Sequence, residues 1–172
     1  MQIVQHNINK LLLNVIIGVA NPSSQYHRTR ENFYGIIKIM LDCLIMGDSI
    51  AVGTQMFDKE CAIIAKGGIN SYQWVNKNIG QAPYQAKTVI ISLGSNDHKY
   101  VKTESELLTI RKLTKADRVY WILPAIKPDI QEIVKKVAAE YGDVVIPIKS
   151  LQPDGIHPSW AGYKDIVAKT KN

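Results

Sequence analysis

Residues 43–49 read Cys-Leu-Ile-Met-Gly-Asp-Ser, a short apolar run that ends abruptly at Gly47, and a helix is expected to begin just after Ser49. Such a run is typical of a buried parallel strand, and open α/β folds bind their ligands where these strands end. Ser49 is therefore a candidate nucleophile. A Gly-Asp-Ser tripeptide by itself is more often a turn or a helix N-cap, so residues elsewhere in the chain must decide between these interpretations.

The composition is that of an ordinary globular domain. The chain has 172 residues, of which 46% are apolar and 21% charged, and this length allows one domain with a sizeable core. The formal net charge of +6 is spread along the chain and forms no basic run. Nucleic-acid binding is therefore permitted but not indicated.

The cysteines and apolar segments give no sign of a secreted or membrane protein. Cys43 and Cys61 are both expected in strands and are interpreted as small buried residues, without a disulfide framework or a metal-ligand spacing. No apolar stretch reaches the ~18 residues that span a membrane, and residues 11–20 are interpreted as a strand and not as a signal peptide. We expect no cofactor or metal, and a cytoplasmic location or a place in a larger assembly.

Strands and helices alternate from residue 43 onward. Branched apolar runs predict strands, amphipathic segments predict helices, and Gly/Asn/Asp-rich loops follow the strands. This alternation predicts a mostly parallel sheet with helices on both faces, and the loops then converge on one edge. The predicted strands are 43–46, 61–65, 88–93, 119–123 and 144–148, and the predicted helices are 49–57, 71–78, 104–113, 129–141 and 159–170.

Three of these loops offer partners for Ser49. In Asp154-x-x-His157 the carboxylate can accept the Nδ1–H of the imidazole while Nε2 faces the serine hydroxyl, which is the base-and-orienter arrangement of a serine triad. An oxyanion needs hydrogen-bond donors, and the backbone N–H groups of Ser49 and Gly68 and the carboxamide of Asn96 are candidates. Trp74 and Trp160 also lie near the site in sequence, and packing beneath the loops is the favoured interpretation of both.

Taken in order, these motifs resemble the four blocks of the SGNH (GDSL-type) hydrolase family over about residues 43–170. The resemblance implies a flavodoxin-like three-layer α/β/α sandwich with a five-stranded parallel sheet. It also implies the catalytic residues Ser49, Asp154 and His157, and an oxyanion hole from Ser49, Gly68 and Asn96. The domain is short for this family, and Ile50 stands where leucine is usual. The blocks are Gly47-Asp48-Ser49, Gly68, Gly94-x-Asn96-Asp97 and Asp154-x-x-His157.

Residues 1–42 are predicted to form a β-α extension packed on the main domain at residues 43–172, with a strand at 11–19 and a helix at 29–41. Residues 15–35 are similar to the N-terminus of bacterial peptidyl-tRNA hydrolases, but Glu31 stands where that family has its catalytic histidine. The extension is therefore interpreted as a packing element, and as a surface through which a protein partner could bind.

These observations favour a metal-independent serine esterase or deacylase that hydrolyses small acyl esters, acetyl above all, through an acyl-enzyme. The short loops predict an open, shallow site suited to an acylated carbohydrate such as a polysaccharide. Two alternatives remain. One is a non-catalytic structural or assembly component that retains the fold, and the other, which only the N-terminal segment supports, is a protein that acts on peptidyl-tRNA.

Overall fold

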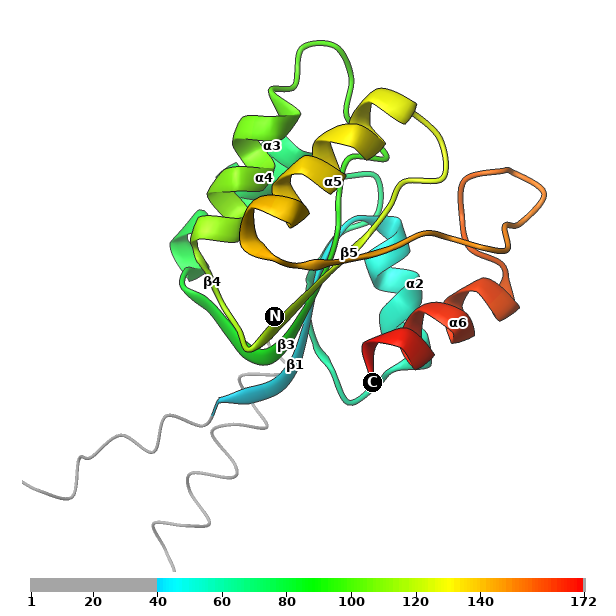
Figure 1. Cartoon of the computed structure of the whole chain (residues 1–172), viewed down its shortest axis with the longest axis horizontal. Helices are drawn as coiled ribbons and strands as arrows, with labels where there is room; N and C mark the ends of the chain where they lie inside the picture. The colour runs from blue at the N-terminus through cyan, green and yellow to red at the C-terminus, as the bar shows by residue number, and fades with distance from the viewer. Residues whose placement is uncertain (1–39, 172) are drawn as a thin grey trace, which may run out of the picture. The chain divides into compact units, whose positions relative to one another are not determined.

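A computed structural model of the chain describes residues 40–171, which form a parallel sheet with helices on both faces (Figure 1). The strand order is β2-β1-β3-β5-β6, and every pair is parallel. A two-residue strand also pairs with β3, so the sheet has six strands where five were predicted. The strands are β1 Leu41–Gly47, β2 Ala62–Ala65, β3 Tyr84–Ser92, β4 Thr114–Lys115, β5 Arg118–Ile122 and β6 Val144–Ile146.

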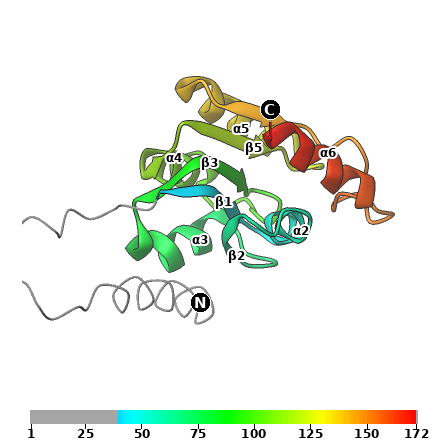
Figure 2. The ribbon, with the colours of Figure 1, turned by 90° about the horizontal axis from the view of Figure 1, so that it is seen from below.

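The helices divide between the two faces of the sheet. Helices α3, α4 and α5 cover one face, and α2 and α6 lie together on the other (Figures 1 and 2). This α/β/α arrangement confirms the predicted layers. The helices are α2 Ser49–Phe57, α3 Ser71–Asn78, α4 Thr103–Lys112, α5 Pro128–Tyr141 and α6 Trp160–Thr170, and a short 3₁₀ helix, η1, spans Ile79–Gln81. Among these helices, none is long and apolar enough to cross a membrane.

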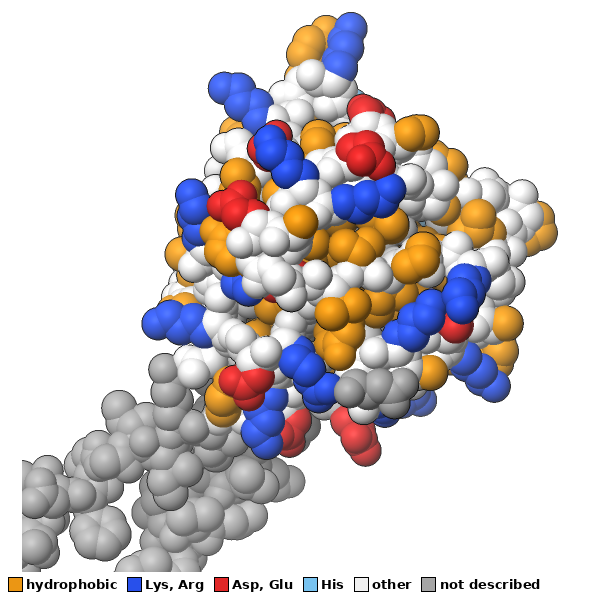
Figure 3. Space-filling model, viewed as in Figure 1, with side chains coloured by type: hydrophobic (Ala, Val, Ile, Leu, Met, Phe, Trp, Pro, Cys, Tyr) orange, Lys and Arg blue, Asp and Glu red, His pale blue; other side chains and the backbone are white. Residues whose placement is uncertain are grey.

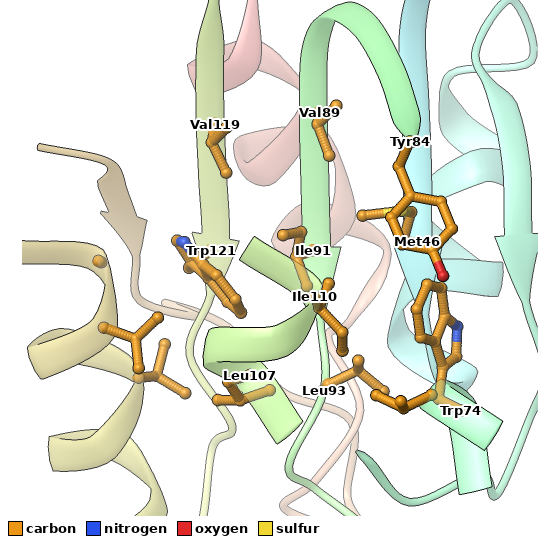
Figure 4. Close-up of a cluster of buried hydrophobic side chains, with 14 of the residues drawn as sticks. Met46, Trp74, Tyr84, Val89, Ile91, Leu93, Leu107, Ile110, Val119 and Trp121 are labelled. Atoms are coloured by element: carbon orange, nitrogen blue, oxygen red, sulfur yellow. The ribbon is translucent and has the colours of Figure 1, made fainter. Parts of the chain in front are cut away.

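Alternation along the buried strands builds two cores. In β3, Ile91 points into the cluster beneath α3, α4 and α5, whereas its neighbour Ile90 points toward α2 and α6. The first cluster includes Trp74, Leu107 and Trp121 (Figure 4). Because both faces of the strands are buried, the strands read as continuous apolar runs and not as alternating patterns.

The carboxyl ends of three strands are level with one another. Gly47 at the end of β1 pairs with Ala65 of β2 on one side and with Ser92 of β3 on the other. The loops that follow these strands therefore leave the sheet at one edge. These loops carry Gly68 and Asn96, and Ser49 begins α2 directly after β1 at the same edge.

Most of the predicted N-terminal extension lies outside the described residues. This holds for the strand at 11–19, the similarity at 15–35 and most of the helix at 29–41. The end of that helix was wrong, because Met40 is not helical and Leu41 begins β1.

A disulfide joins Cys43 to Cys61, contrary to the prediction of two unpaired buried cysteines. The pairing register of β1 and β2 sets Leu44 opposite Ala62, which brings the two preceding cysteines face to face. Cys61 comes just before β2 and is not part of it. Disulfides are typical of oxidising compartments, and the expected cytoplasmic location stays a prediction.

Reduction of this disulfide is expected to lower the free energy of unfolding by about 3 kcal/mol, because the bond closes a loop with a sequence separation of 18 in the unfolded chain. Urea unfolding with and without a thiol reductant measures the difference. The double variant Cys43→Ser/Cys61→Ser is the control. It should lose a similar free energy of unfolding, and its unfolding midpoint should be the same with and without the reductant. Identical unfolding midpoints in oxidised and reduced protein would contradict the prediction.

Candidate active site

Ser49 is the first residue of α2 and directly follows the turn out of β1. Gly47 makes this turn possible, since its φ is +142° and a Cβ there would collide with the carbonyl oxygen of Ser92. Asp48 then caps the helix by accepting a hydrogen bond from the N–H of Ile50 at 2.9 Å. The serine is thereby held at the positive end of the α2 dipole, where a developing negative charge is stabilised.

Asp48 is fully buried behind the nucleophile. Its Oδ1 also accepts the hydroxyl of Ser92 at 3.1 Å, whereas its Oδ2 has no hydrogen-bond partner within residues 40–171. Burial raises the pKa of Asp48 to about 6, because desolvation outweighs the hydrogen bonds that favour the carboxylate. The contacts of Asp48 hold the start of α2 and the end of β3, and they do not include the hydroxyl of Ser49.

The structure brings together the three residues that the sequence singled out. Ser49 Oγ lies 2.9 Å from His157 Nε2, and His157 Nδ1 lies 2.7 Å from Asp154 Oδ2. The side chains of His157 and Asp154 are 33% and 43% exposed, so this chain of hydrogen bonds lies at the surface. With Nδ1–H donated to Asp154, Nε2 is free to accept the serine proton.

Asp154 is held in its charged form. It accepts the backbone N–H groups of Ile156 at 2.9 Å and of His157 at 3.0 Å, in addition to the imidazole. The N–H of Ile156, the imidazole and the N–H of His157 lower the pKa of Asp154 to about 2. Asp154 is therefore ionised throughout the neutral range and can stabilise an imidazolium.

Backbone contacts hold the histidine loop in place. Gln152 donates its backbone N–H to the carbonyl of His157 at 2.8 Å and its side-chain amide to the carbonyl of Pro158 at 3.0 Å. Ser159 caps α6 by accepting the N–H of Gly162 at 3.1 Å. The imidazole thus projects from a tight loop anchored to a helix, which limits its motion relative to Ser49.

The three candidate oxyanion donors lie at the start of α2 and on the loops after β2 and β3. Gly68 has a φ of +74°, and a Cβ there would contact nothing within 4 Å, so the backbone conformation and not crowding by the protein favours glycine. Within the described part of the chain, the N–H groups of Ser49 and Gly68 donate to no protein acceptor. Asn96 donates one carboxamide hydrogen to the carbonyl of Ile69 at 3.1 Å, which leaves its second hydrogen available.

Asp97 has a role for which no expectation was drawn from the sequence beyond its place in the block Gly94-x-Asn96-Asp97. This residue is 2% exposed and accepts the N–H and the hydroxyl of Ser71 at 2.7 and 2.6 Å, and the hydroxyl of Thr103 at 2.7 Å. It therefore ties the loop after β3 to the starts of α3 and α4. The aspartate follows Asn96 directly, so its contacts position the carboxamide.

Lys127 supports the same loop from the other side, and no sequence pattern indicated this role. Its ammonium group donates to the carbonyls of Ser95 at 2.7 Å and Asp97 at 2.6 Å. The backbone of Lys127 is in the left-handed region, with φ of +67°, immediately before α5. Asn96 is therefore flanked by two residues whose carbonyl groups are fixed by one lysine.

The two tryptophans near the site differ. Trp74 is completely buried and donates its indole N–H to the carbonyl of Ile64 at 3.0 Å, which confirms the packing interpretation. Trp160 is 71% exposed and rests edge-on against Phe57, with 4.6 Å between ring centroids. The packing interpretation was therefore wrong for Trp160, which presents an indole surface to solvent three residues after His157.

Hydrophobic side chains gather in a shallow hollow on the face of the molecule shown in Figure 3. The hollow has a volume of about 580 Å³ and lies between α5 and residues 147–151. It reaches the base of the histidine loop through Leu151, but neither Ser49 nor His157 lines it. Its lining is Leu123, Pro124, Ala125, Gln131, Lys135, Val145, Pro147, Ile148 and Leu151.

Within residues 40–171, one cluster of side chains has the spacing of metal ligands, and it consists of Cys43, Asp58 and Cys61. Its two sulfur atoms form the disulfide, so they offer no thiolate to a metal. This cluster is made of residues other than Ser49, His157 and Asp154.

The sequence matches no protein-family model, and no curated protein matches it either. The fold, however, is shared with several solved structures. A GDSL-like lipase from Bacteroides thetaiotaomicron has a TM-score of 0.56 at 20% identity, over 78% of this chain and 87% of that one. The C-terminal catalytic domain of peptidoglycan O-acetyltransferase A from Streptococcus pneumoniae has a TM-score of 0.50 at 19% identity, over 76% and 93%.

A third solved structure, phospholipase A1 from Streptomyces albidoflavus, has a TM-score of 0.52 at 13% identity, over 76% of this chain and 99% of that one. The likenesses confirm the α/β fold that the four sequence blocks implied. The chain thus shares its fold with this GDSL-like lipase, and at one edge of its sheet it carries a serine, a histidine and an aspartate in hydrogen-bond contact.

Proposed function

We propose that this protein is a serine esterase that hydrolyses small acyl esters through an acyl-enzyme. Ser49 is the nucleophile, His157 the general base, and Asp154 the residue that orients the imidazole. The observation that carries the proposal is the continuous chain of hydrogen bonds from the Ser49 hydroxyl through His157 to Asp154 at the edge where three strands end.

The first half of the reaction forms the acyl-enzyme. Ser49 Oγ attacks the ester carbonyl carbon while its proton passes to Nε2 of His157, and Asp154 stabilises the resulting imidazolium. The carbonyl oxygen becomes an oxyanion that accepts the N–H groups of Ser49 and Gly68 and the carboxamide of Asn96. The imidazolium then returns the proton to the leaving alkoxide, and the alcohol departs.

The second half repeats these steps with water. His157 takes a proton from a water molecule as the water oxygen attacks the acyl carbon. The same three donors hold the second oxyanion, and the proton passes from the imidazolium to Ser49 Oγ as the bond to the serine breaks. The carboxylic acid is released, and no cofactor takes part.

Two features support a small acyl group on a carbohydrate. The histidine and aspartate of the site are 33% and 43% exposed, so the site offers little apolar surface to a long acyl chain. Trp160 displays its indole beside the histidine loop, supported from below by Phe57. An exposed aromatic ring of this kind has a flat apolar face and a polar edge, which suits the mixed surface of a sugar ring.

Labelling with a serine-directed fluorophosphonate tests the proposal directly. We expect one phosphonyl group on Ser49, located by mass mapping, and no label on the Ser49→Ala variant or on unfolded wild-type protein. Absence of labelling, or labelling at another residue, would overturn the assignment of the nucleophile. Such an outcome would favour the alternative of a non-catalytic structural or assembly protein.

Acetyl and propionyl esters are expected to have kcat/KM values at least equal to those of octanoyl and longer esters. Each buried methylene group would contribute ~0.8 kcal/mol of binding, but an open site buries few of them. A series of nitrophenyl esters of increasing chain length measures this. A steady rise of kcat/KM through eight carbons would contradict the prediction and point to the apolar hollow near Leu151, where Leu151→Asp should then abolish the rise.

A further inference from the structure

A second hollow, with a volume of about 210 Å³, lies beside the candidate oxyanion hole. Residues 66–69 of the loop after β2 form one wall, and Gln73 and Lys77 of α3 form the other. Gly68 lines this hollow and also offers its N–H to the proposed oxyanion. We call this hollow the Lys66–Lys77 pocket.

Two residues that line the Lys66–Lys77 pocket, Gly67 and Gly68, connect it to the candidate active site. A Cβ added to Gly67 would point toward Ser49, at 3.9 Å from the Cβ of the serine, so this lining residue faces the nucleophile although Ser49 itself does not line the pocket. Because Gly68 lines the pocket and is also a proposed oxyanion donor, a ligand in the pocket would lie near an ester bound at Ser49. The pocket is positioned to contact the substrate itself.

The charge of the pocket is positive and unbalanced. Lys66 and Lys77 are both exposed, and within residues 40–171 neither forms an ion pair with a carboxylate. The sequence contains no aspartate or glutamate between Glu60 and Asp97. The Oε1 of Gln73 accepts the N–H of Asn70 at 3.3 Å, which leaves the amide NH₂ of Gln73 as a further donor.

We propose that the Lys66–Lys77 pocket binds an oxyanion group, a carboxylate or a phosphate, carried by the alcohol part of the substrate. Two ammonium groups and an amide NH₂ are donors that compact oxyanions accept. This inference rests on the proposed esterase function, in which the acyl group is too small to carry the charge. The substrate is then an acylated acidic carbohydrate, and the pocket selects it over a neutral one.

The kinetic test compares three acetylated sugars that differ in one substituent: methyl glucoside, methyl glucuronide and methyl glucoside 6-phosphate. At low salt, we expect wild-type kcat/KM to be about tenfold higher for at least one charged sugar than for the neutral one, since two exposed ion pairs each give a few-fold. The sugar with the larger ratio identifies carboxylate or phosphate. Equal rates for all three sugars would overturn the proposal.

The variant Lys66→Met/Lys77→Met removes both charges and keeps the aliphatic stems. Its ratio of charged to neutral kcat/KM should fall to about one, and any loss common to both substrates cancels in the ratio. Lys112→Met, at the far end of α4, is the matched control and should keep the wild-type ratio. An unchanged ratio in the double variant would overturn the proposal, provided that both variants unfold at the wild-type temperature.

A binding measurement separates this proposal from the esterase function. Calorimetric titration with an unacetylated oligogalacturonate or with a phosphorylated oligosaccharide requires no hydrolysis. Wild type should bind at least one of them in a salt-sensitive way, and the double variant should bind it about tenfold more weakly. Failure of fluorophosphonate labelling overturns the esterase and leaves the pocket as an oxyanion-binding site without an assigned substrate, whereas undiminished binding by Lys66→Met/Lys77→Met overturns the pocket alone.

Discussion

Ser49→Ala is expected to lower kcat/KM for a nitrophenyl acetate ester by a factor of about 10⁴ to 10⁶, because the serine oxygen is the atom that attacks and no neighbouring group replaces it. Stability should change little. Ser49 is half-buried, and within residues 40–171 its hydroxyl has one partner, Nε2 of His157 at 2.9 Å. Steady-state kinetics and urea unfolding on the same preparations measure the two effects separately.

Ser105→Ala is the matched control for this variant. Ser105 is also a helical serine, but it lies exposed on α4, so its replacement should leave the rate unchanged. Hydrolysis by Ser49→Ala at the rate of Ser105→Ala, with both proteins folded, would refute the assignment of the nucleophile. An inactive wild type would instead favour the non-catalytic alternative.

The sequence predicted the layers of this fold because each buried strand is a local signal. The run Leu44–Met46 is apolar throughout and ends at a glycine, and the apolar run Val89–Ile91 of β3 likewise stops shortly before Gly94. Strands that end in this way place their following loops at one edge whatever the details of packing. Ser49 and His157 could therefore be brought together from spacing and topology alone.

The contacts that hold the loops could not be predicted in the same way. Asp97 accepts hydrogen bonds from Ser71 and Thr103, which lie 26 and 6 residues away in the chain, and Lys127 reaches two carbonyls about 30 residues away. Each of these side chains fits a turn or a helix start when considered alone. Only the packing of α3, α4 and α5 against the sheet decides which of them meet.

The disulfide was missed for a related reason. Cys43 and Cys61 meet because β1 and β2 pair in one particular register, with Leu44 opposite Ala62. The sequence indicated both strands, but it contains no signal for their relative shift. If β2 were shifted by one residue along β1, Cys61 would no longer lie opposite Cys43. The bond therefore depends on the pairing register, which the apolar pattern of each strand does not specify.

Asn96→Ala is expected to reduce kcat for acetyl ester hydrolysis by a factor of about 100 to 1,000, with a smaller effect on KM. The carboxamide hydrogen that does not bind Ile69 is the third proposed donor to the oxyanion, and a donor aimed at the developing charge acts mainly in the transition state. Asn96→Asp should fall in the same range, since it keeps the shape of the side chain but replaces the amide group with a negative charge.

Asn76→Ala is the matched control, because Asn76 also donates its carboxamide to a backbone carbonyl, that of Tyr72 at 2.8 Å, but on the exposed face of α3. Both alanine variants lose one such hydrogen bond, which typically contributes about 1 kcal/mol to stability, so similar unfolding is expected from both. Only Asn96→Ala should lose activity. Wild-type kcat in Asn96→Ala would exclude the carboxamide as an oxyanion donor and leave that role to the backbone N–H groups of Ser49 and Gly68.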